Sequence, residues 1–196
     1  MFISLEGVDG SGKSTQARLL AEALGPETLL IREPGGTGAA ERIRELLADP
    51  ALEIDPFAEL LLFSAARADL LARVVRPALE DGGTVVADRF ADSSVAYQGG
   101  ARGLGTSYVL SLVDQTIDGL WPDLTVYLRI DPEVGLKRAD GRDRFEAEGL
   151  ELQRAVAEAY DEIATIASDR VVVVDADGSV EEVHQRVMAA VSRQPD

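Results

Sequence analysis

The chain has 196 residues, of which 46% are hydrophobic and 28% charged, proportions typical of one globular domain with a substantial core. Its net charge of −16 argues against a nucleic-acid polymer as partner, because such binding needs a basic surface. It contains no cysteine, which excludes disulfides and thiolate metal sites. No segment has the pattern of a signal peptide, and none approaches the ~18 apolar residues that span a membrane. We therefore expect a cytoplasmic protein without a membrane partner.

The chain begins with a short apolar run, residues 1–5, whose composition predicts a buried strand. Residues 7–14 then match the phosphate-binding loop G-x-x-x-x-G-K-[ST], and residues 15–24 have a helical spacing of apolar side chains. In this setting, backbone N–H groups and the helix N-terminus hold phosphate oxygens. Lys13 is expected to reach the β- and γ-phosphates, and Ser14 to bind Mg²⁺. The alternative, a glycine-rich turn before an ordinary helix, is disfavoured because motif and context are both satisfied.

A second buried strand is predicted at residues 28–31, after Gly25-Pro26 ends the first helix. It leads into Arg-Glu-Pro-Gly-Gly-Thr at 32–37, at the carboxyl end of the strand, where open α/β sheets bind their ligands. Helical patterns follow over about 38–48 and over about 55–80, the second starting with an Asp-Pro pair that suits a helix N-terminus.

The second half of the chain continues the alternation of strands and helices. We predict strands at 84–87, 124–130 and 171–174, a loop or short helix at 92–98 broken by Gly99-Gly100, and helices at 106–118, from Pro132, at 150–167 and after a capping box at Ser179–Glu182. Continuous apolar strands between helices form a parallel sheet covered on both faces. The predicted fold class is α/β: a P-loop NTPase fold in which a parallel five-stranded sheet carries helices on both faces (three-layer α/β/α), as one domain over residues 1–196.

Sequence features that are missing exclude some classes of nucleoside triphosphate-binding protein. A GTPase reads guanine with an Asn-Lys-x-Asp element, and the chain contains no asparagine. Transport and helicase ATPases need further modules that 196 residues do not supply. A small kinase remains, with a second anion site opposite the phosphate loop. A deoxynucleoside kinase or another nucleoside monophosphate kinase stays open as an alternative, as does a non-enzymatic ATP-dependent switch of the ParA type.

Phosphoryl transfer between two phosphates needs cations that stabilise their shared charge. Arg32, Arg67 and Arg89 are candidates, two of them at strand ends on the ligand edge. Phe63 lies four residues before Arg67 and so on the same helix face, where a ring could stack on a base and the arginine take a phosphate. Helical spacing alone favours a core phenylalanine and a surface ion pair instead. Asp88, after a buried strand, is expected to bind Mg²⁺ or its water shell, the alternative being a local pair with Arg89.

Five segments, in this order, are similar to those of the thymidylate kinase family: 2–15, 32–37, 88–90, 93–98 and 143–146. The resemblance runs nearly end to end, and the Arg-Glu-Pro-Gly-Gly-Thr segment is far more specific than the phosphate loop. The resemblance implies transfer of the γ-phosphoryl group of ATP to dTMP, which gives dTDP and ADP in dTTP synthesis. It also implies Mg²⁺ as a cofactor and a homodimer.

The resemblance further implies roles for single residues. It places Phe63 against the thymine base, Arg67 against the phosphate, and Asp9 against the sugar 3′-hydroxyl or the phosphates. Three more residues fall where the family contacts the base and sugar: Ser94, Tyr97 and Gln98. A packing role is an even alternative for the tyrosine.

A polar segment at about 138–148 corresponds to the family's lid and contains Arg138, Arg142 and Arg144. Gly10 and Ser11 occupy the loop positions where one branch of the family has a catalytic arginine, so a lid arginine is expected to supply that charge. We favour Arg142, although a solvated loop is the commoner fate of such charged runs.

Taken together, the predicted catalytic residues are Asp9, Lys13, Arg89 and Arg142. The predicted ATP contacts are Gly7, Val8, Asp9, Gly10, Ser11, Gly12, Lys13, Ser14, Thr15, Arg138 and Arg144. The predicted dTMP contacts are Asp9, Arg32, Phe63, Arg67, Arg89, Ser94, Tyr97 and Gln98.

Overall fold

The computed structural model describes residues 1–138 and 148–193. Its strands are β1 (Phe2–Glu6), β2 (Leu29–Arg32), β3 (Val85–Asp88), β4 (Leu124–Arg129) and β5 (Val171–Asp175). Its helices are α1 (Lys13–Leu24), α2 (Gly38–Ala48), α3 (Pro56–Leu70), α4 (Arg76–Glu80), α5 (Ala91–Ser94), α6 (Thr106–Ile117), α7 (Pro132–Arg138), α9 (Leu150–Ile166) and α10 (Val180–Val191). Two π-helical segments, η1 (Leu71–Val75) and η2 (Val95–Ala101), continue α3 and α5.

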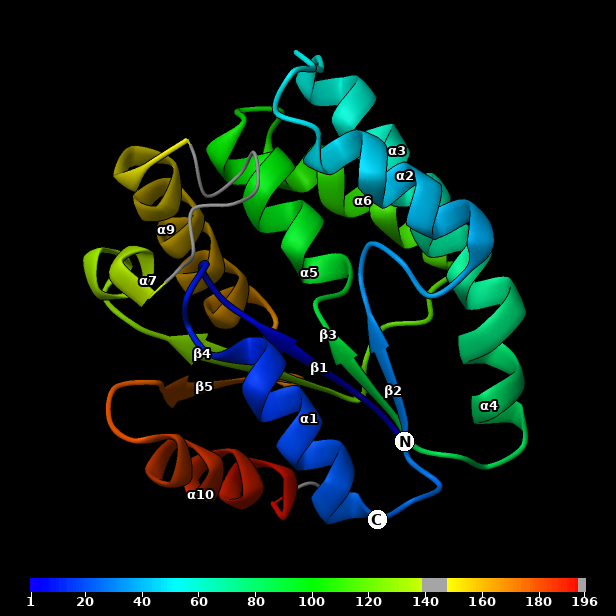
Figure 1. The fold of residues 1–196 in the computed structure, drawn as a ribbon, viewed down its shortest axis with the longest axis vertical. Coiled ribbons are helices and arrows are strands. Elements are labelled where there is room, and N and C mark those ends of the chain that lie inside the picture. The colour runs from blue at the N-terminus through cyan, green and yellow to red at the C-terminus, as the bar shows by residue number, and fades with distance from the viewer. Residues whose placement is uncertain (139–147, 194–196) are drawn as a thin grey trace.

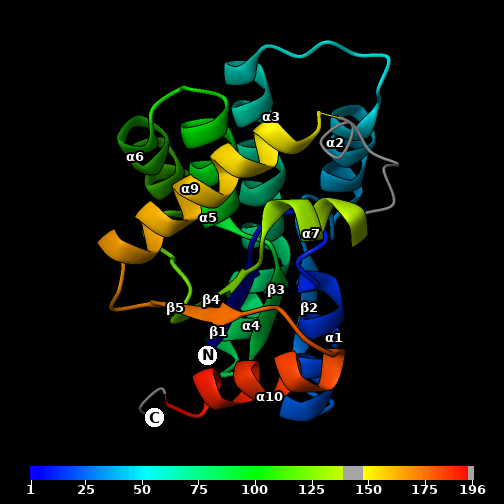
Figure 2. The same cartoon turned by 90° about the vertical axis from the view of Figure 1, so that its left-hand side faces the viewer.

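The five strands form one parallel sheet in the order β2-β3-β1-β4-β5 (Figure 1). Every residue of β1 and β3 is buried, as continuous apolar strands at the centre of a parallel sheet require, whereas the edge strands β2 and β5 are partly exposed. Helices α1 and α10 pack together on one face, while α9 and the long helix from α3 to α4 belong to the other layer (Figures 1 and 2). The predicted three-layer α/β fold is confirmed.

Local capping signals fix several helix starts. Asp55 accepts hydrogen bonds from two backbone N–H groups at the start of α3, and Asp131 caps α7 in a similar way. Ser179 and Glu182 form the predicted capping box of α10, with both reciprocal hydrogen bonds present. None of the described helices is both long and apolar enough to span a bilayer.

The predicted break at Gly99-Gly100 is wrong, because the helix runs on through η2 to Ala101. The glycines serve close packing instead. A Cβ atom on Gly100 would lie 2.5 Å from the Cβ atom of Ala159 in α9, and one on Gly99 would lie 3.1 Å from the Cα atom of Thr106 in α6. These two positions let η2 sit tightly between its neighbours.

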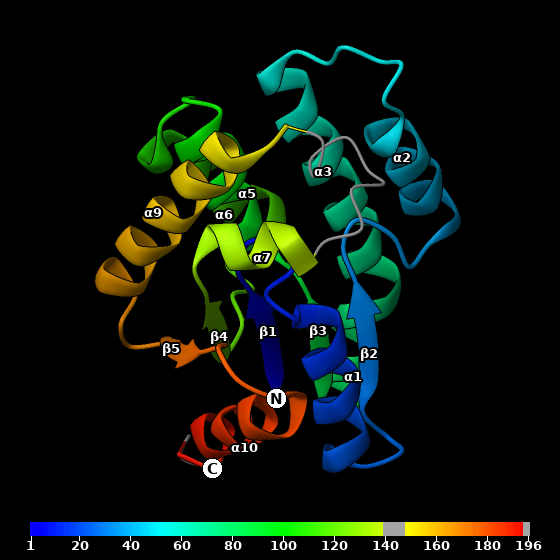
Figure 3. The same ribbon diagram turned by 60° about the vertical axis from the view of Figure 1, so that its left-hand side comes forward.

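The sheet register brings three strand ends together. Asp88 at the end of β3 pairs with Leu5 of β1 on one side and with Arg32 of β2 on the other. The loop after β1 and the start of α1 therefore meet the ends of β2 and β3 at one edge. Helix α7 lies beside the same edge, next to the end of β1 (Figure 3). This edge is where ligands bind in open α/β sheets.

Candidate active site

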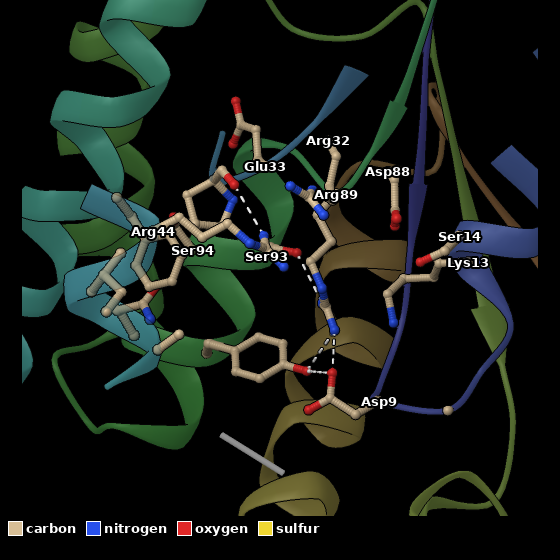
Figure 4. A pocket seen from close by; sticks show the side chains of 17 residues that line it. Asp9, Lys13, Ser14, Arg32, Glu33, Arg44, Asp88, Arg89, Ser93 and Ser94 are labelled. Carbon is tan, nitrogen blue, oxygen red and sulfur yellow. Dashed lines mark hydrogen bonds and ion pairs between the residues drawn. The ribbon is translucent and has the colours of Figure 1, made fainter. Parts of the chain in front are cut away.

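A cavity of about 290 Å³ opens at this edge of the sheet. Its lining residues come from the loop after β1, from the ends of β2 and β3, and from helices α2, α3 and α5 with η2: Asp9, Gly10, Lys13, Ser14, Arg32, Glu33, Pro34, Arg44, Leu47, Ala48, Phe63, Asp88, Arg89, Ser93, Ser94, Tyr97 and Gln98. In Figure 4, Lys13, Ser14 and Asp88 stand on one side of it and Arg44 and Ser94 on the other. Arg89 extends between the two sides towards Asp9 (Figure 4).

The loop that carries the phosphate motif depends on glycine at defined positions. Gly7 and Gly10 have φ values of 144° and 71°, which side chains rarely adopt. A Cβ atom on Gly7 would lie 2.6 Å from the carbonyl oxygen of Leu128, and one on Gly10 would lie 1.9 Å from that of Gly135 in α7. The loop is thus pressed between β4 and α7, and only glycine fits there.

Helix α1 begins directly at the end of this loop. Gly12 is its N-cap and no side chain caps it, so the first-turn N–H groups of the helix point at the loop without a side-chain acceptor. Such a helix start attracts anions through its N–H groups and its dipole. This helix end, with the loop, forms a cradle suited to phosphate oxygens.

Lys13 is buried inside the cradle, where its Nζ atom donates to the carbonyl oxygen of Val8 at 2.7 Å. The pKa of its ammonium group is lowered to about 8, first by burial and then by the nearby positive charge of Arg89, against the opposing charges of Asp9, Asp88 and Glu6. An arriving polyphosphate would supply the negative charge that restores the ordinary preference for the ammonium form.

Ser14 and Asp88 face the same part of the cavity (Figure 4). The hydroxyl group of Ser14 is exposed, and no hydrogen bond of the Asp88 carboxylate is present within the described residues. One carboxylate and one hydroxyl are the hard oxygen ligands that Mg²⁺ shares with phosphates and water. The described residues contain no group of three or more acidic or histidine side chains placed to hold a metal ion, so a metal here would take most of its ligands from nucleotide and water.

Asp9 and Arg89 are joined at the centre of the cavity. An Nη2–H of Arg89 donates to Oδ1 of Asp9 and, at 3.1 Å, to the hydroxyl oxygen of Tyr97. Burial by itself would raise the pKa of Asp9, but the charges of Arg89 and Lys13 and the hydrogen bonds of Gln153 and Tyr97 outweigh it and lower the pKa. Asp9 is therefore held as a carboxylate.

The backbone of Arg89 has φ 70°, unusual for a residue other than glycine, and such a conformation costs about 1 kcal/mol or more. Glu6, fully buried at the end of β1, accepts from the backbone N–H of Phe90 at 2.7 Å and from the hydroxyl of Ser93 at 2.6 Å. The pKa of Glu6 is raised to about 7, first by burial and then by the negative charge of Asp92, against the hydrogen bonds of Ser93 and Tyr160 and the charge of Arg89. Glu6 thus fixes the turn that aims Arg89 into the cavity.

Phe63 of α3, Ser94 of α5 and Gln98 of η2 also line the cavity, whereas Arg67 does not reach the lining. Arg67 is 1% exposed and donates through Nε to Glu33 at 2.8 Å and through Nη2 to Phe90 and Ser94. Breaking such a buried ion pair costs on the order of 3–5 kcal/mol. Only its Nη1 atom lacks a partner among the described residues. The surface ion pair that helical spacing favours is wrong, because the sheet register places Glu33 beneath α3.

Several residues of this site are absent from the predicted site residues, and two of them are polar side chains that bear on its chemistry. Arg44 of α2 lines the cavity. Gln153 of α9 makes two hydrogen bonds with Asp9: its Nε2 atom donates to Oδ2 of Asp9 at 2.7 Å, and its Oε1 atom accepts from the Asp9 backbone N–H at 3.0 Å. A sequence signal for Gln153 exists. It falls with Val156 and Tyr160 on the buried face of an amphipathic helix, where a lone polar side chain needs a partner.

The remaining predicted residues lie as follows. Arg32 is on the cavity wall, half-exposed and paired with Glu41 at 3.6 Å. Arg138 is outside the lining, with its guanidinium group 3.6 Å from Asp177. Arg142 and Arg144, with most of the predicted lid, fall outside the described residues.

A phosphate cradle at a helix start, facing a second wall that carries arginines and an aromatic ring, defines the class of small P-loop kinases. The sequence model of the family described as "Thymidylate kinase" matches residues 5–187. A thymidylate kinase of Deinococcus radiodurans is 46% identical over 98% of this chain and 96% of its own length. One from Halothermothrix orenii is 45% identical over 95% and 94%. A crystal structure of thymidylate kinase from Ehrlichia chaffeensis superposes with a TM-score of 0.82 at 34% identity, covering 98% of both chains.

The chain therefore belongs to the thymidylate kinase family, a family of nucleoside monophosphate kinases.

Proposed function

We propose that this protein transfers the γ-phosphoryl group of ATP to dTMP, giving dTDP and ADP for dTTP synthesis. The observation that carries the proposal is that a phosphate cradle and a wall with Arg32, Arg44, Arg89 and Phe63 line one and the same cavity. The cradle suits a triphosphate, and the facing wall suits a nucleoside monophosphate whose phosphate must approach it. Membership of the thymidylate kinase family supports dTMP as that acceptor.

On the donor side, residues 7–15 hold the phosphates of ATP through backbone N–H groups and through Lys13. Ser14 and Asp88 would hold Mg²⁺, which would neutralise charge on the phosphate oxygens. Arg138 and Arg144 complete the ATP site and Arg142 stabilises the transferring group, as parts of a lid at about 138–148 in one domain over residues 1–196.

On the acceptor side, Arg89 and Arg32 bind the phosphate of dTMP, and the aromatic ring of Phe63 stacks on the base. Arg44 lines the same wall and joins them as a phosphate contact. Arg67 acts from behind the acceptor wall, since it does not line the cavity itself and its Nη2 atom donates to the hydroxyl group of Ser94, which does. Tyr97 and Asp9 face the sugar, where the tyrosine ring crowds a 2′-hydroxyl and Asp9 accepts from the 3′-hydroxyl.

The test is ADP release by the purified protein with Mg-ATP and single acceptors. We expect dTMP to stimulate ADP release strongly, and deoxynucleosides or purine monophosphates to stimulate it little. ADP release equal with and without dTMP would refute the proposal. Slow hydrolysis that needs a protein partner but no acceptor would instead indicate the ATP-dependent switch.

A homodimer is the further part of the proposal. Phe57 and Leu61 on α3 and Tyr108 on α6 are exposed large apolar residues, and the rings of Phe57 and Tyr108 lie 6.3 Å apart. Such a patch on two adjacent helices suits a second copy of the chain. Sedimentation showing only single chains at micromolar concentration would contradict this. A cytoplasmic location fits the ATP and nucleotide pools that the reaction uses.

Gln153 offers a test of the role of Asp9. Replacement by glutamate keeps the shape of the side chain but puts a carboxylate 2.7 Å from Oδ2 of Asp9, so it should raise the pKa of Asp9. We expect turnover of the Gln153→Glu variant to fall steeply at acid pH, where the wild type stays active, and to recover as pH rises through the raised pKa. Gln153→Met, which has no charge, should lose activity without this acid limb. Superimposable pH profiles for all three proteins would show that Gln153 only fills space.

A further inference from the structure

A buried carboxylate stands behind the base end of the cavity. Glu59 of α3 is 0% exposed, and its Oε1 atom accepts from Nε2 of Gln98 at 2.9 Å. Both oxygens also accept from Arg102, from Nε at 3.2 Å and from Nη2 at 3.2 Å. Arg102 is itself held from the other side by Glu148. The guanidinium group of Arg102 therefore compensates the charge of a carboxylate that water cannot reach.

This pair determines which way the amide group of Gln98 turns. An ionised carboxylate can only accept hydrogen bonds, so the amide must present its NH₂ group to Glu59. The carbonyl oxygen of Gln98 then has no hydrogen-bond partner within residues 1–138 and 148–193, and Gln98 lines the cavity beside Ser94. The oxygen is thus left to the cavity as a fixed acceptor, and Phe63, which lines the same cavity, offers a stacking surface.

We propose that the Glu59–Arg102 pair is a positioning device that makes the enzyme select a pyrimidine with a ring N–H over one without. Thymine and uracil carry a proton on N3 and can donate to the Gln98 oxygen. Cytosine has a lone pair at N3, so two acceptors would face each other and Gln98 could not turn without breaking its bond to Glu59. The inference rests on the proposed function, because it takes a pyrimidine monophosphate as the acceptor.

The expected size of the discrimination follows from the unmet hydrogen bond. A site built to pair with an N–H group rejects an analogue that lacks it by a factor on the order of 10² or more, because buried polar groups are left unpaired. The Glu59–Arg102 pair affects only the hydrogen bond to N3 of the base and makes no contact with the 5-methyl group in this proposal. The ratio of kcat/KM for dUMP to that for dTMP is therefore independent of Glu59 in this proposal. The ratio of kcat/KM for dCMP to that for dTMP depends on Glu59.

The experiment measures kcat/KM for dTMP, dUMP and dCMP with the wild type, Glu59→Gln, Arg102→Met and a control, Arg129→Met, whose side chain is 59% exposed on β4. A glutamine at 59 can donate as well as accept, so Gln98 is free to turn. We expect the dCMP to dTMP ratio to rise at least about tenfold in Glu59→Gln, while the dUMP to dTMP ratio stays within about twofold of the wild type. The control should match the wild type in both ratios.

Arg102→Met provides a second route if Glu59→Gln does not fold. Without the guanidinium group, the Glu59 carboxylate loses the donors that fix its orientation, so Gln98 is held less firmly and the dCMP to dTMP ratio should also rise. An unchanged dCMP to dTMP ratio in a variant that still phosphorylates dTMP would overturn the inference, as would equal shifts of the dUMP and dCMP ratios. Failure of the wild type to phosphorylate dTMP would instead refute the proposed function.

Discussion

Replacement of Lys13 by methionine should lower turnover by on the order of 10³-fold, because the residue supplies the side-chain cation that the motif aims at the β- and γ-phosphates. Methionine keeps the length of the buried stem, so the loop should retain its shape. The cradle of backbone N–H groups remains, so ATP affinity should fall much less than turnover. Single-turnover kinetics with saturating ATP would separate the two effects.

The chain provides a matched control for this variant. Lys137 is the only other lysine, and it is exposed on α7, outside the cavity lining. Lys137→Met makes the same chemical change and should leave turnover within about twofold of the wild type, as surface substitutions usually do. Wild-type turnover in Lys13→Met would refute the assignment of the phosphate loop.

Replacement of Arg89 by alanine should reduce kcat/KM for dTMP by about 10²- to 10³-fold, with a much smaller effect on the KM for ATP. Arg89 reaches from the end of β3 into the cavity, where its guanidinium group meets Asp9, Tyr97 and the carbonyl oxygen of Gly7. Its loss removes the acceptor phosphate contact and leaves Asp9 without its main compensating charge. Steady-state kinetics with each substrate varied in turn would measure the two effects.

Arg89→Gly separates chemistry from backbone strain. Glycine adopts φ 70° without penalty, so this variant should have a higher melting temperature than Arg89→Ala while losing the same activity. Arg129→Ala, at an exposed arginine, is the control for removal of a positive charge. Equal losses of affinity for ATP and dTMP in the two Arg89 variants would place Arg89 elsewhere than at the acceptor phosphate.

Much of the fold can be predicted from local sequence patterns, because the hydrogen bonds that each pattern predicts join residues only a few positions apart. The Asp55-Pro56 start and the Ser179–Glu182 capping box act across one helical turn, and both are present as predicted. The phosphate loop is equally local: its glycines and Lys13 are at fixed spacing, and the adjacent strand and helix follow directly. Gly99-Gly100 shows the limit, since its helix persists through contacts with α6 and α9.

The contacts within the site are harder to predict from the sequence, because its charged side chains pair with partners from distant segments of the chain. Arg67 has the same helical spacing from Phe63 whether it faces solvent, a phosphate or Glu33, and only the register of β2 beneath α3 decides for the buried ion pair. Gln153 meets Asp9 across 144 residues, and Glu59 meets Gln98 across 39.

The sequence by itself determined the strand–loop–helix cradle, the alternation that makes a parallel sheet, and the arginines available to a second anion. Only the tertiary structure decided which guanidinium groups reach the cavity and which neutralise buried carboxylates. The physical reason is that helix and strand formation depends on neighbours along the chain, whereas the partner of a buried charge is whichever opposite charge the packing brings within a few ångströms.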